Sequence, residues 1–423
     1  MRTAYRTLAV LAVLATSIVM VLPSLSAPLR DRSVQRKIVK RVATRHVARP
    51  ADQALLMPSY EFGAPLPDLT PAELTAFATG LDEFNTAETP AGGLGPIMNN
   101  RSCVSCHSQP AVGGGSGIRV TRFGRTVNGA FDPMASLGGS LLQQNSIDPR
   151  ILEVVPTTAT ISIQRQSTPI FGMGLVEAIP DETILGNAER QQSLGLNGVP
   201  SLVIDMVSGR TRVGRFGWKA QLATVLEFSG DAYLNEMGVT NRLFPQENAP
   251  NGNTALLAQF DRVSDPEDTP DPVSGKADID VVADFMRFLA PPPQLVFTQS
   301  ALQGRTLFAQ TGCSGCHTPQ MMTGPNTIKA LNFREVNLYS DLLLHDMGML
   351  GDGIAQGTAG TRDMKTPPLW GLRASAPYLH DGRAPNVDAA IQAHDGEALT
   401  SRNQYRQLNA TQRQQLIEFL NSI

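Results

Sequence analysis

Two short motifs contain every cysteine of the chain. Residues 103–107 (CVSCH) and 313–317 (CSGCH) share the spacing Cys-x-x-Cys-His. In each motif the two thiols can add to the two vinyl groups of a haem, and the histidine that follows becomes an axial ligand of the iron. The motifs therefore predict two covalently attached c-type haems. The attachment residues are Cys103, Cys106, Cys313 and Cys316, and the axial ligands are His107 and His317.

Zinc binding and disulfide formation are the two competing interpretations of these cysteines. A zinc site of four thiolates brings two Cys-x-x-Cys pairs together, and disulfides are common in exported proteins. Neither chemistry explains why a histidine follows both pairs. Haem attachment is therefore the favoured interpretation.

The second axial ligand of each iron has few sources, because the chain holds only six histidines. His345, His380 and His394 all lie after the second motif, and the first half offers no histidine after His107. The first haem must therefore take a methionine, another side chain, water or no second ligand. This difference separates the roles of the two haems.

Similar helices are expected before the two motifs. The first should begin after Thr70, which can cap a helix with Pro71 in its first turn and Glu73 three residues after the cap. The second is expected around Ser300 to Ala309. Each helix carries a glycine four residues before a phenylalanine, so another element can approach the face on which the phenylalanine lies. The pairs are Gly80 with Phe84 and Gly304 with Phe308.

Both halves are also expected to close with an amphipathic helix, at residues 279–289 and 412–420. The stretch 290–293 (APPP) cannot continue a helix and marks the domain boundary. The predicted fold is mostly α, with long loops and little strand. It comprises two cytochrome c-like helical domains, residues 66–290 and 291–423, each binding one haem. The first domain contains insertions.

The N-terminus predicts export. Residues 1–27 combine two arginines, an apolar run of about 15 residues and a small-residue end, as a signal peptide does. An uncleaved anchor is the alternative, but the run is shorter than the roughly 20 residues of a membrane span. Export to the periplasm or beyond is therefore expected.

A basic arm and linker follow at residues 28–65. Residues 28–49 hold eight Lys/Arg and one Asp, a local charge of +7 in a chain whose net charge is −3. Nucleic-acid binding is not expected, because proteins that bind nucleic acid concentrate their positive charge on a folded domain. A solvated leader is favoured, and loose attraction to anionic lipid is the alternative.

The stretch 261–280 is rich in Asp, Pro and Ser and is expected to form an exposed acidic loop. Calcium binding is a candidate role for it, and a plain solvated loop is the favoured one.

Four further segments carry a resemblance to a known family. They are residues 168–180 (TPIFGMGLVEAIP), 215–220 (RFGWKA), 339–348 (YSDLLLHDMG) and 366–384 (TPPLWGLRASAPYLHDGRA). With the two haem motifs they resemble the di-haem oxidoreductases of peroxidase type, which are similar to bacterial di-haem cytochrome c peroxidases. The resemblance runs from about residue 66 to the C-terminus. It implies a haem enzyme that reacts with peroxide.

The resemblance also implies ligands for the second haem. His394 stands where the related peroxidases usually have a methionine, which implies two imidazoles on this iron and a lower reduction potential. A surface histidine at a helix end is the alternative. His380 is expected near a haem edge or propionate, or else as an ordinary buried histidine.

At the first haem the resemblance implies catalytic residues. Glu177 is the candidate acid/base for splitting peroxide, and Gln166 can orient the substrate; a capping or surface carboxylate is the alternative for Glu177. The matching motifs and helices indicate one cytochrome module used twice. If this repeat holds, Met237 is loosely equivalent to His394 and can ligate the first iron; packing in the core is the alternative. Trp218 and Trp370 can relay electrons between the haems, with core packing as the default.

The predicted function is peroxide reduction at the first haem. Electrons enter through the second haem from a small exported donor, a cytochrome or a cupredoxin. An electron carrier without substrate turnover is one alternative, and oxidation of a thiol or a partner protein is another.

Overall fold

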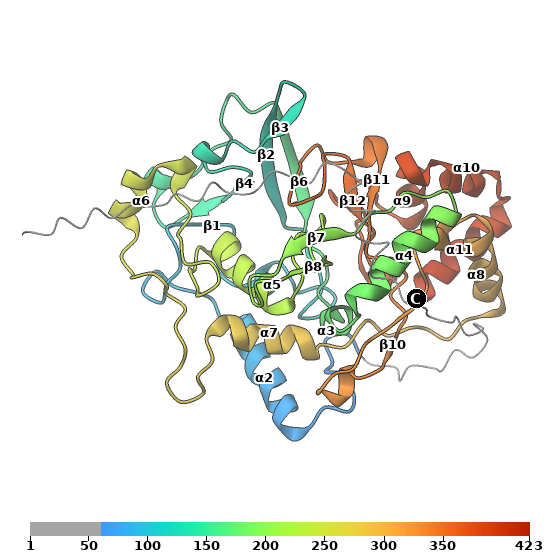
Figure 1. Cartoon of the computed structure of the whole chain (residues 1–423), viewed down its shortest axis with the longest axis horizontal. Coiled ribbons are helices and arrows are strands. Elements are labelled where there is room, and N and C mark those ends of the chain that lie inside the picture. The colour runs from blue at the N-terminus through green and yellow to red at the C-terminus, as the bar shows by residue number, and fades with distance from the viewer. Residues whose placement is uncertain (1–60) are drawn as a thin grey trace, which may run out of the picture.

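The structure, a computed structural model, describes residues 61–423. The predicted signal peptide and nearly all of the basic arm lie outside the described residues. In the described part, helices are the larger elements and most strands are short, with long loops between them (Figure 1). No helix within this part is long and apolar enough to cross a membrane.

The helices are α2 (Pro71–Asn85), α3 (Met173–Glu177), α4 (Asp181–Ser193), α5 (Val225–Ala232), α6 (Thr254–Phe260), α7 (Asp278–Phe288), α8 (Gln299–Gln310), α9 (Val387–Ala393), α10 (Leu399–Gln407) and α11 (Ala410–Ser422). The strands are β1 (Ile97–Met98), β2 (Arg119–Val127), β3 (Ala130–Asp132), β4 (Leu141–Leu142), β5 (Asn145–Ser146), β6 (Ile161–Gln166), β7 (Ser201–Ile204), β8 (Thr211–Gly214), β9 (Met321–Met322), β10 (Glu335–Val336), β11 (Leu344–Asp346) and β12 (Asp363–Lys365).

The largest sheet is antiparallel and belongs to the first half. Strand β2 pairs with β3, β4 and β6, and Arg119 lies opposite Gln166 at the end of the β2–β6 pair. The small pairs β7–β8 and β11–β12 lie closer to the C-terminal helices (Figure 1). Gln166 is the last residue of β6, at the edge where this sheet ends.

The predicted start of the first helix is confirmed. The Thr70 hydroxyl accepts a hydrogen bond from the Glu73 N–H at 3.3 Å, and the Glu73 carboxylate accepts one from the Thr70 N–H at 2.7 Å. Two of the N–H groups without a partner at the helix start are thereby satisfied.

The role expected for the two helical glycines is also confirmed. A Cβ on Gly80 would lie 2.4 Å from the Val281 carbonyl oxygen of α7, and one on Gly304 would lie 2.0 Å from the Gln415 carbonyl oxygen of α11. Only glycine permits these approaches. Helices α2 and α7 therefore pack closely, and α8 and α11 repeat the arrangement in the C-terminal part (Figure 1).

Each crossing also buries a pair of phenylalanines. The ring centroids of Phe84 and Phe285 are 4.9 Å apart, and those of Phe308 and Phe419 are 5.4 Å apart. The helices before the two motifs are thus supported in the same way.

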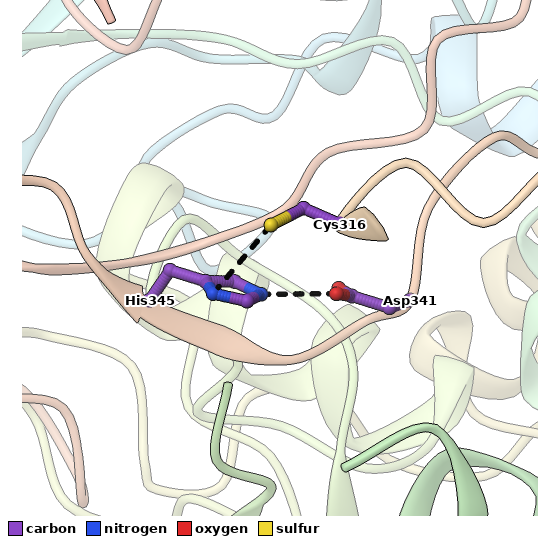
Figure 2. Close-up of side chains that lie close together, drawn as sticks. All are labelled: Cys316, Asp341 and His345. Carbon is purple, nitrogen blue, oxygen red and sulfur yellow. Dashed lines mark hydrogen bonds and ion pairs between the residues drawn. The ribbon is translucent and has the colours of Figure 1, made fainter. Parts of the chain in front are cut away.

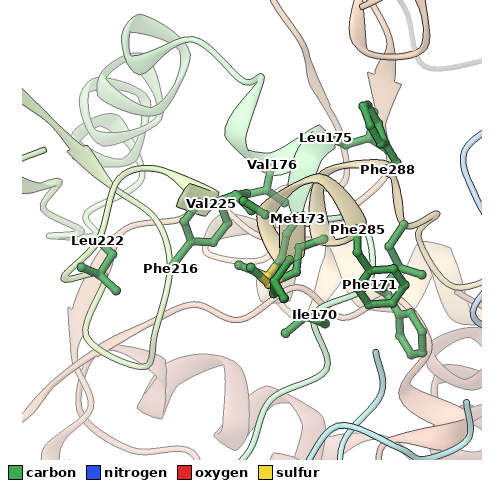
Figure 3. Close-up of a cluster of buried hydrophobic side chains, with 14 of the residues drawn as sticks. Ile170, Phe171, Met173, Leu175, Val176, Phe216, Leu222, Val225, Phe285 and Phe288 are labelled. Carbon is green, nitrogen blue, oxygen red and sulfur yellow. The ribbon is translucent and has the colours of Figure 1, made fainter. Parts of the chain in front are cut away.

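The main hydrophobic cluster surrounds α3 and α7 (Figure 3). It includes residues of the second half such as Leu338 and Leu343, while a second cluster joins α8 and α11. The two halves therefore share packing contacts. The division into haem domains at residue 290 stays a prediction.

Candidate haem sites

Each Cys-x-x-Cys-His motif forms one tight helical turn. The His107 N–H donates to the Cys103 carbonyl at 3.1 Å, and the His317 N–H donates to the Cys313 carbonyl at 2.9 Å. The four thiols form no disulfide. Burial, followed by nearby carboxylates, raises the pKa of Cys103 to about 12. The turns therefore present thiols and imidazole as the haem interpretation expects.

Backbone carbonyls fix the tautomer of both motif histidines. Nδ1 of His107 lies 3.0 Å from the Gly114 oxygen, and Nδ1 of His317 lies 3.1 Å from the Tyr339 oxygen. Because each carbonyl accepts from Nδ1–H, the lone pair stays on Nε2, where it can bind a metal.

His394 faces His317. Their ring centroids are 6.4 Å apart, and Nδ1 of His394 bonds the Ala390 oxygen at 2.8 Å, at the end of α9. A metal–imidazole bond is about 2 Å long, so two imidazoles on one iron have centroids roughly 6 Å apart. Burial, with repulsion from His394 next, lowers the pKa of His317 to about 4, which keeps the ring neutral and able to ligate. The pair therefore fits one haem iron.

A cavity of about 320 Å³ opens beside this pair. Its lining is mostly apolar and comes from both halves of the chain, as a haem requires. It includes Cys313, Cys316, His317, Trp370, His380 and His394. The residues of the C-terminal site thus fit a covalently held haem.

A comparison with known families agrees with this geometry. The family described as "Di-haem oxidoreductase, putative peroxidase" matches residues 153–423, well over half of the chain. The chain belongs to the di-haem oxidoreductase family. The match begins after the first haem motif, so the N-terminal haem site rests on the motif itself.

Individual relatives are distant. Cytochrome c peroxidase Ccp of Escherichia coli K12 is 21% identical over 220 residues, covering 48% of this chain and 44% of that protein. The chain therefore matches less than half of the length of this relative.

Solved structures give low overall similarity. A MauG-like protein associated with microbial copper homeostasis has a TM-score of 0.39 at 14% identity, covering 89% of this chain and 95% of its own. The diheme peroxidase BthA from Burkholderia thailandensis E264 has a TM-score of 0.37 at 14% identity, covering 85% and 86%.

Gln166 and His380 meet at the cavity of this di-haem oxidoreductase. The Gln166 N–H donates to the His380 carbonyl at 2.7 Å, and its side-chain amide donates to the Pro377 carbonyl at 2.9 Å. The Trp218 indole donates to the Gln166 carbonyl at 2.9 Å and lies edge-on to His380, with centroids 6.3 Å apart. Burial lowers the pKa of His380. Gln166, expected at the first haem, therefore lines the cavity beside His317 and His394.

Glu177 lies at the end of α3 and does not line this cavity. One carboxylate oxygen accepts from Nε of Arg287 at 3.0 Å, and the other accepts from the Val225 N–H at 2.7 Å, at the start of α5. The carboxylate thus caps a helix and forms an ion pair. Its role as an acid/base stays a prediction.

Met237 is buried in the main hydrophobic cluster. Its carbonyl accepts from the Gly95 N–H at 3.1 Å, and the Glu236 carbonyl accepts from the Asn99 N–H at 2.8 Å. The fold therefore holds Met237 beside the segment that leads into Cys103. Ligation by Met237 stays a prediction, with packing as the alternative.

The predicted acidic loop is continuously exposed only from Thr269 to Lys276, because Asp268 is buried and accepts hydrogen bonds from the Asp278 and Ile279 N–H groups at the start of α7. The carboxylates of Glu247, Asp265 and Glu267 lie within 4.8 Å of one another. Burial, with repulsion from Glu267 next, raises the pKa of Glu247 to about 9. Calcium binding at this loop stays a prediction.

His345 forms a buried charged cluster that the sequence did not reveal in full. Its Nε2 lies 2.9 Å from Oδ2 of Asp341, and its Nδ1 lies 3.7 Å from the Cys316 sulfur (Figure 2). The same Nδ1 lies 3.0 Å from Oε2 of Glu397. Burial alone would lower the pKa of His345, but attraction to Asp341 and three hydrogen bonds raise it well above its usual range. The ring is therefore an imidazolium between two carboxylates.

This cluster connects the segments that hold the two candidate axial ligands, His317 and His394. Asp341 lies two residues after Tyr339, whose carbonyl accepts from His317, and Glu397 lies three residues after His394. The i,i+4 spacing of Asp341 and His345 was visible in the sequence, but the distant partner Glu397 was not.

Replacing His345 with glutamine is expected to destabilise the haem-loaded protein by about 3 kcal/mol, because it leaves two buried carboxylates without a cation. Because folding raises the pKa of His345, the stabilisation by its charge is complete below the pKa of the unfolded chain, about 6.5. This stabilisation is lost as the pH rises through the pKa of the folded protein. Guanidinium unfolding midpoints measured from pH 6 upward test this.

The control for this prediction adds Glu397→Gln to the same chain. The second change removes one of the two facing charges, so the double variant should recover part of the lost stability. Equal midpoints for the wild type and His345→Gln would contradict the assignment of a charged cluster.

Proposed function

We propose that this protein is an exported di-haem oxidoreductase that reduces peroxide at the N-terminal haem and accepts electrons through the C-terminal haem. The observation that carries the proposal is the inequality of the two sites. His317 faces a second imidazole at 6.4 Å, whereas the sequence offers His107 no second histidine in the first half. A site without a strong second ligand is the one open to substrate.

The electron donor and the substrate are proposed from the same division of roles between the two haems. A small exported cytochrome or cupredoxin supplies electrons, in keeping with the name of the E. coli relative, a cytochrome c peroxidase. Hydrogen peroxide takes up two electrons and two protons to give two waters. Haem, when bound, supplies the redox chemistry.

The chain's own residues orient and move protons. The Gly114 and Tyr339 carbonyls hold the two motif imidazoles in the ligating tautomer. Glu177 is proposed to take a proton from peroxide and return it to the leaving oxygen, and Gln166 is proposed to orient the substrate.

Low-temperature EPR of the oxidised, haem-loaded protein tests this division. We expect one high-spin ferric signal from the open N-terminal site and one low-spin signal from the bis-histidine site. Peroxide-dependent oxidation of a reduced cytochrome should accompany them. Two low-spin haems at every redox level would contradict the proposal.

An electron-transfer cytochrome without turnover is the second candidate, and the buried position of Met237 beside the segment leading into Cys103 favours it. In that case Met237→Leu converts one low-spin signal to high spin. Under the peroxidase proposal the same change leaves the spectrum unaltered.

A further inference from the structure

Lys365 is a buried lysine on the wall of the C-terminal cavity. It is the last residue of β12, lies opposite Leu344 of β11, and its backbone N–H donates to the Trp218 carbonyl at 3.0 Å. The residue is only 8% exposed and lines the cavity. Its backbone is therefore fixed at the wall of the cavity in which a haem is proposed to bind.

The ammonium of Lys365 makes no hydrogen bond or ion pair with any residue of the described range 61–423. Lys219, the neighbouring buried lysine, shows how this fold normally satisfies such a group. Its Nζ forms an ion pair with Asp352 at 2.8 Å and donates to two backbone carbonyls. An ammonium without such partners is costly inside a protein, so the contrast indicates a missing anion.

Within residues 61–423, no free carboxylate along the cavity is available to Lys365. Glu397 is the only acidic residue in the described lining, and it is already bonded to His345 and to the Asn197 N–H at 3.0 Å. Attraction to Asp341 does not offset burial, which lowers the pKa of Lys365 to about 8. At neutral pH the side chain is still mostly charged, and residues 61–423 supply no directly bonded counter-anion for it.

The other cations of the lining are occupied. Arg215 donates to carbonyl oxygens at the end of α3, at 2.6 Å for Ile179, and Arg402 donates to the His394 carbonyl at 2.9 Å. Among the described lysines and arginines that line the cavity, Lys365 is thus the one whose side chain has no hydrogen-bond or ion-pair partner. A haem in this cavity would bring two carboxylates with it.

We propose that the Lys365 ammonium binds a carboxylate of the haem attached at Cys313 and Cys316, and by its charge raises the potential of that haem. A buried cation favours the state that has gained an electron, and the interaction is strong where water is excluded. The proposal deepens the proposed function, since it concerns the haem through which electrons enter.

The test compares Lys365→Met, which keeps the length but removes the charge, with Lys365→Arg, which keeps the charge. In spectroelectrochemical titrations of the haem-loaded protein, Lys365→Met should lower the equilibrium constant for reduction of the low-spin haem by about tenfold, ~59 mV for one electron. Lys365→Arg should shift it less. Lys329→Met, at a lysine whose side chain is 75% exposed, is the matched control and should leave the potential unchanged.

An unchanged potential in Lys365→Met would overturn the proposal. The proposal would also be overturned if added acetate shifted the potential of the wild type but not that of Lys365→Met. The anion bound by Lys365 would then be a small ligand and not a haem carboxylate. Neither measurement uses peroxide, so failure here and failure of the peroxidase proposal are distinguishable.

Discussion

A His394→Met variant is expected to raise the midpoint potential of the C-terminal haem by ~0.1–0.2 V, within the roughly 0.8 V range that axial ligands span. A thioether stabilises ferrous iron relative to imidazole. His394 is the side chain placed to make this difference, because its ring lies 6.4 Å from that of His317 and its Nδ1 is already bonded to Ala390.

The measurement is a spectroelectrochemical titration of both haems. His380→Asn is the matched control, because His380 lines the same cavity but lies edge-on to Trp218 and has its carbonyl bonded to Gln166. That control should leave the low-spin EPR signal in place. If His394→Met leaves both midpoints and the low-spin signal unchanged, His394 is not a ligand.

The parts of this fold that depend on local spacing were predictable from the sequence. The capping box at Thr70 involves residues three apart, and the glycine and phenylalanine of each helix are four apart. Steric limits on helix approach then lead to the crossings at Gly80 and Gly304. The turn of each haem motif is equally local.

Contacts between distant segments were not predictable in this way. Glu397 and His345 are 52 residues apart, and Gln166 meets Pro377 across 211 residues. No periodicity encodes such pairs, since they depend on how the long loops return to the cavity. The charged cluster at Cys316 and the unpaired Lys365 therefore emerged only from the fold.

The four-stranded sheet shows the same limit. Strand β2 (RVTRFGRTV) carries three arginines and shows no simple alternation of buried and exposed residues. Its pairing with β6 is set by tertiary contacts and not by an obvious pattern. This sheet nevertheless places Gln166 at the cavity, where its catalytic role stays a prediction.

The family resemblance and the geometry indicate different roles for Glu177. The resemblance assigns it proton transfer at the first haem, while the structure gives its carboxylate two partners, Arg287 and the N–H of Val225. The two roles are compatible only if the ion pair orients the carboxylate without removing its access to substrate. A variant that keeps the shape and removes the charge separates them.

Glu177→Gln is expected to lower peroxide turnover by about 10²–10⁴-fold while both haems stay bound, because an amide cannot take and return a proton. Its oxygen can still accept from the Val225 N–H, so the cap on α5 should survive. Steady-state turnover with a reduced cytochrome measures the loss, and absorbance of the two haems checks their retention.

Arg287→Gln is the matched control, because it breaks the same ion pair from the other side and leaves the Glu177 carboxylate in place. If turnover falls only in Glu177→Gln, the carboxylate itself carries the proton. If both variants lose turnover equally, the ion pair acts by holding α3 and α5 in position. Wild-type turnover in Glu177→Gln would restrict Glu177 to the helix cap and require another proton carrier at the N-terminal haem.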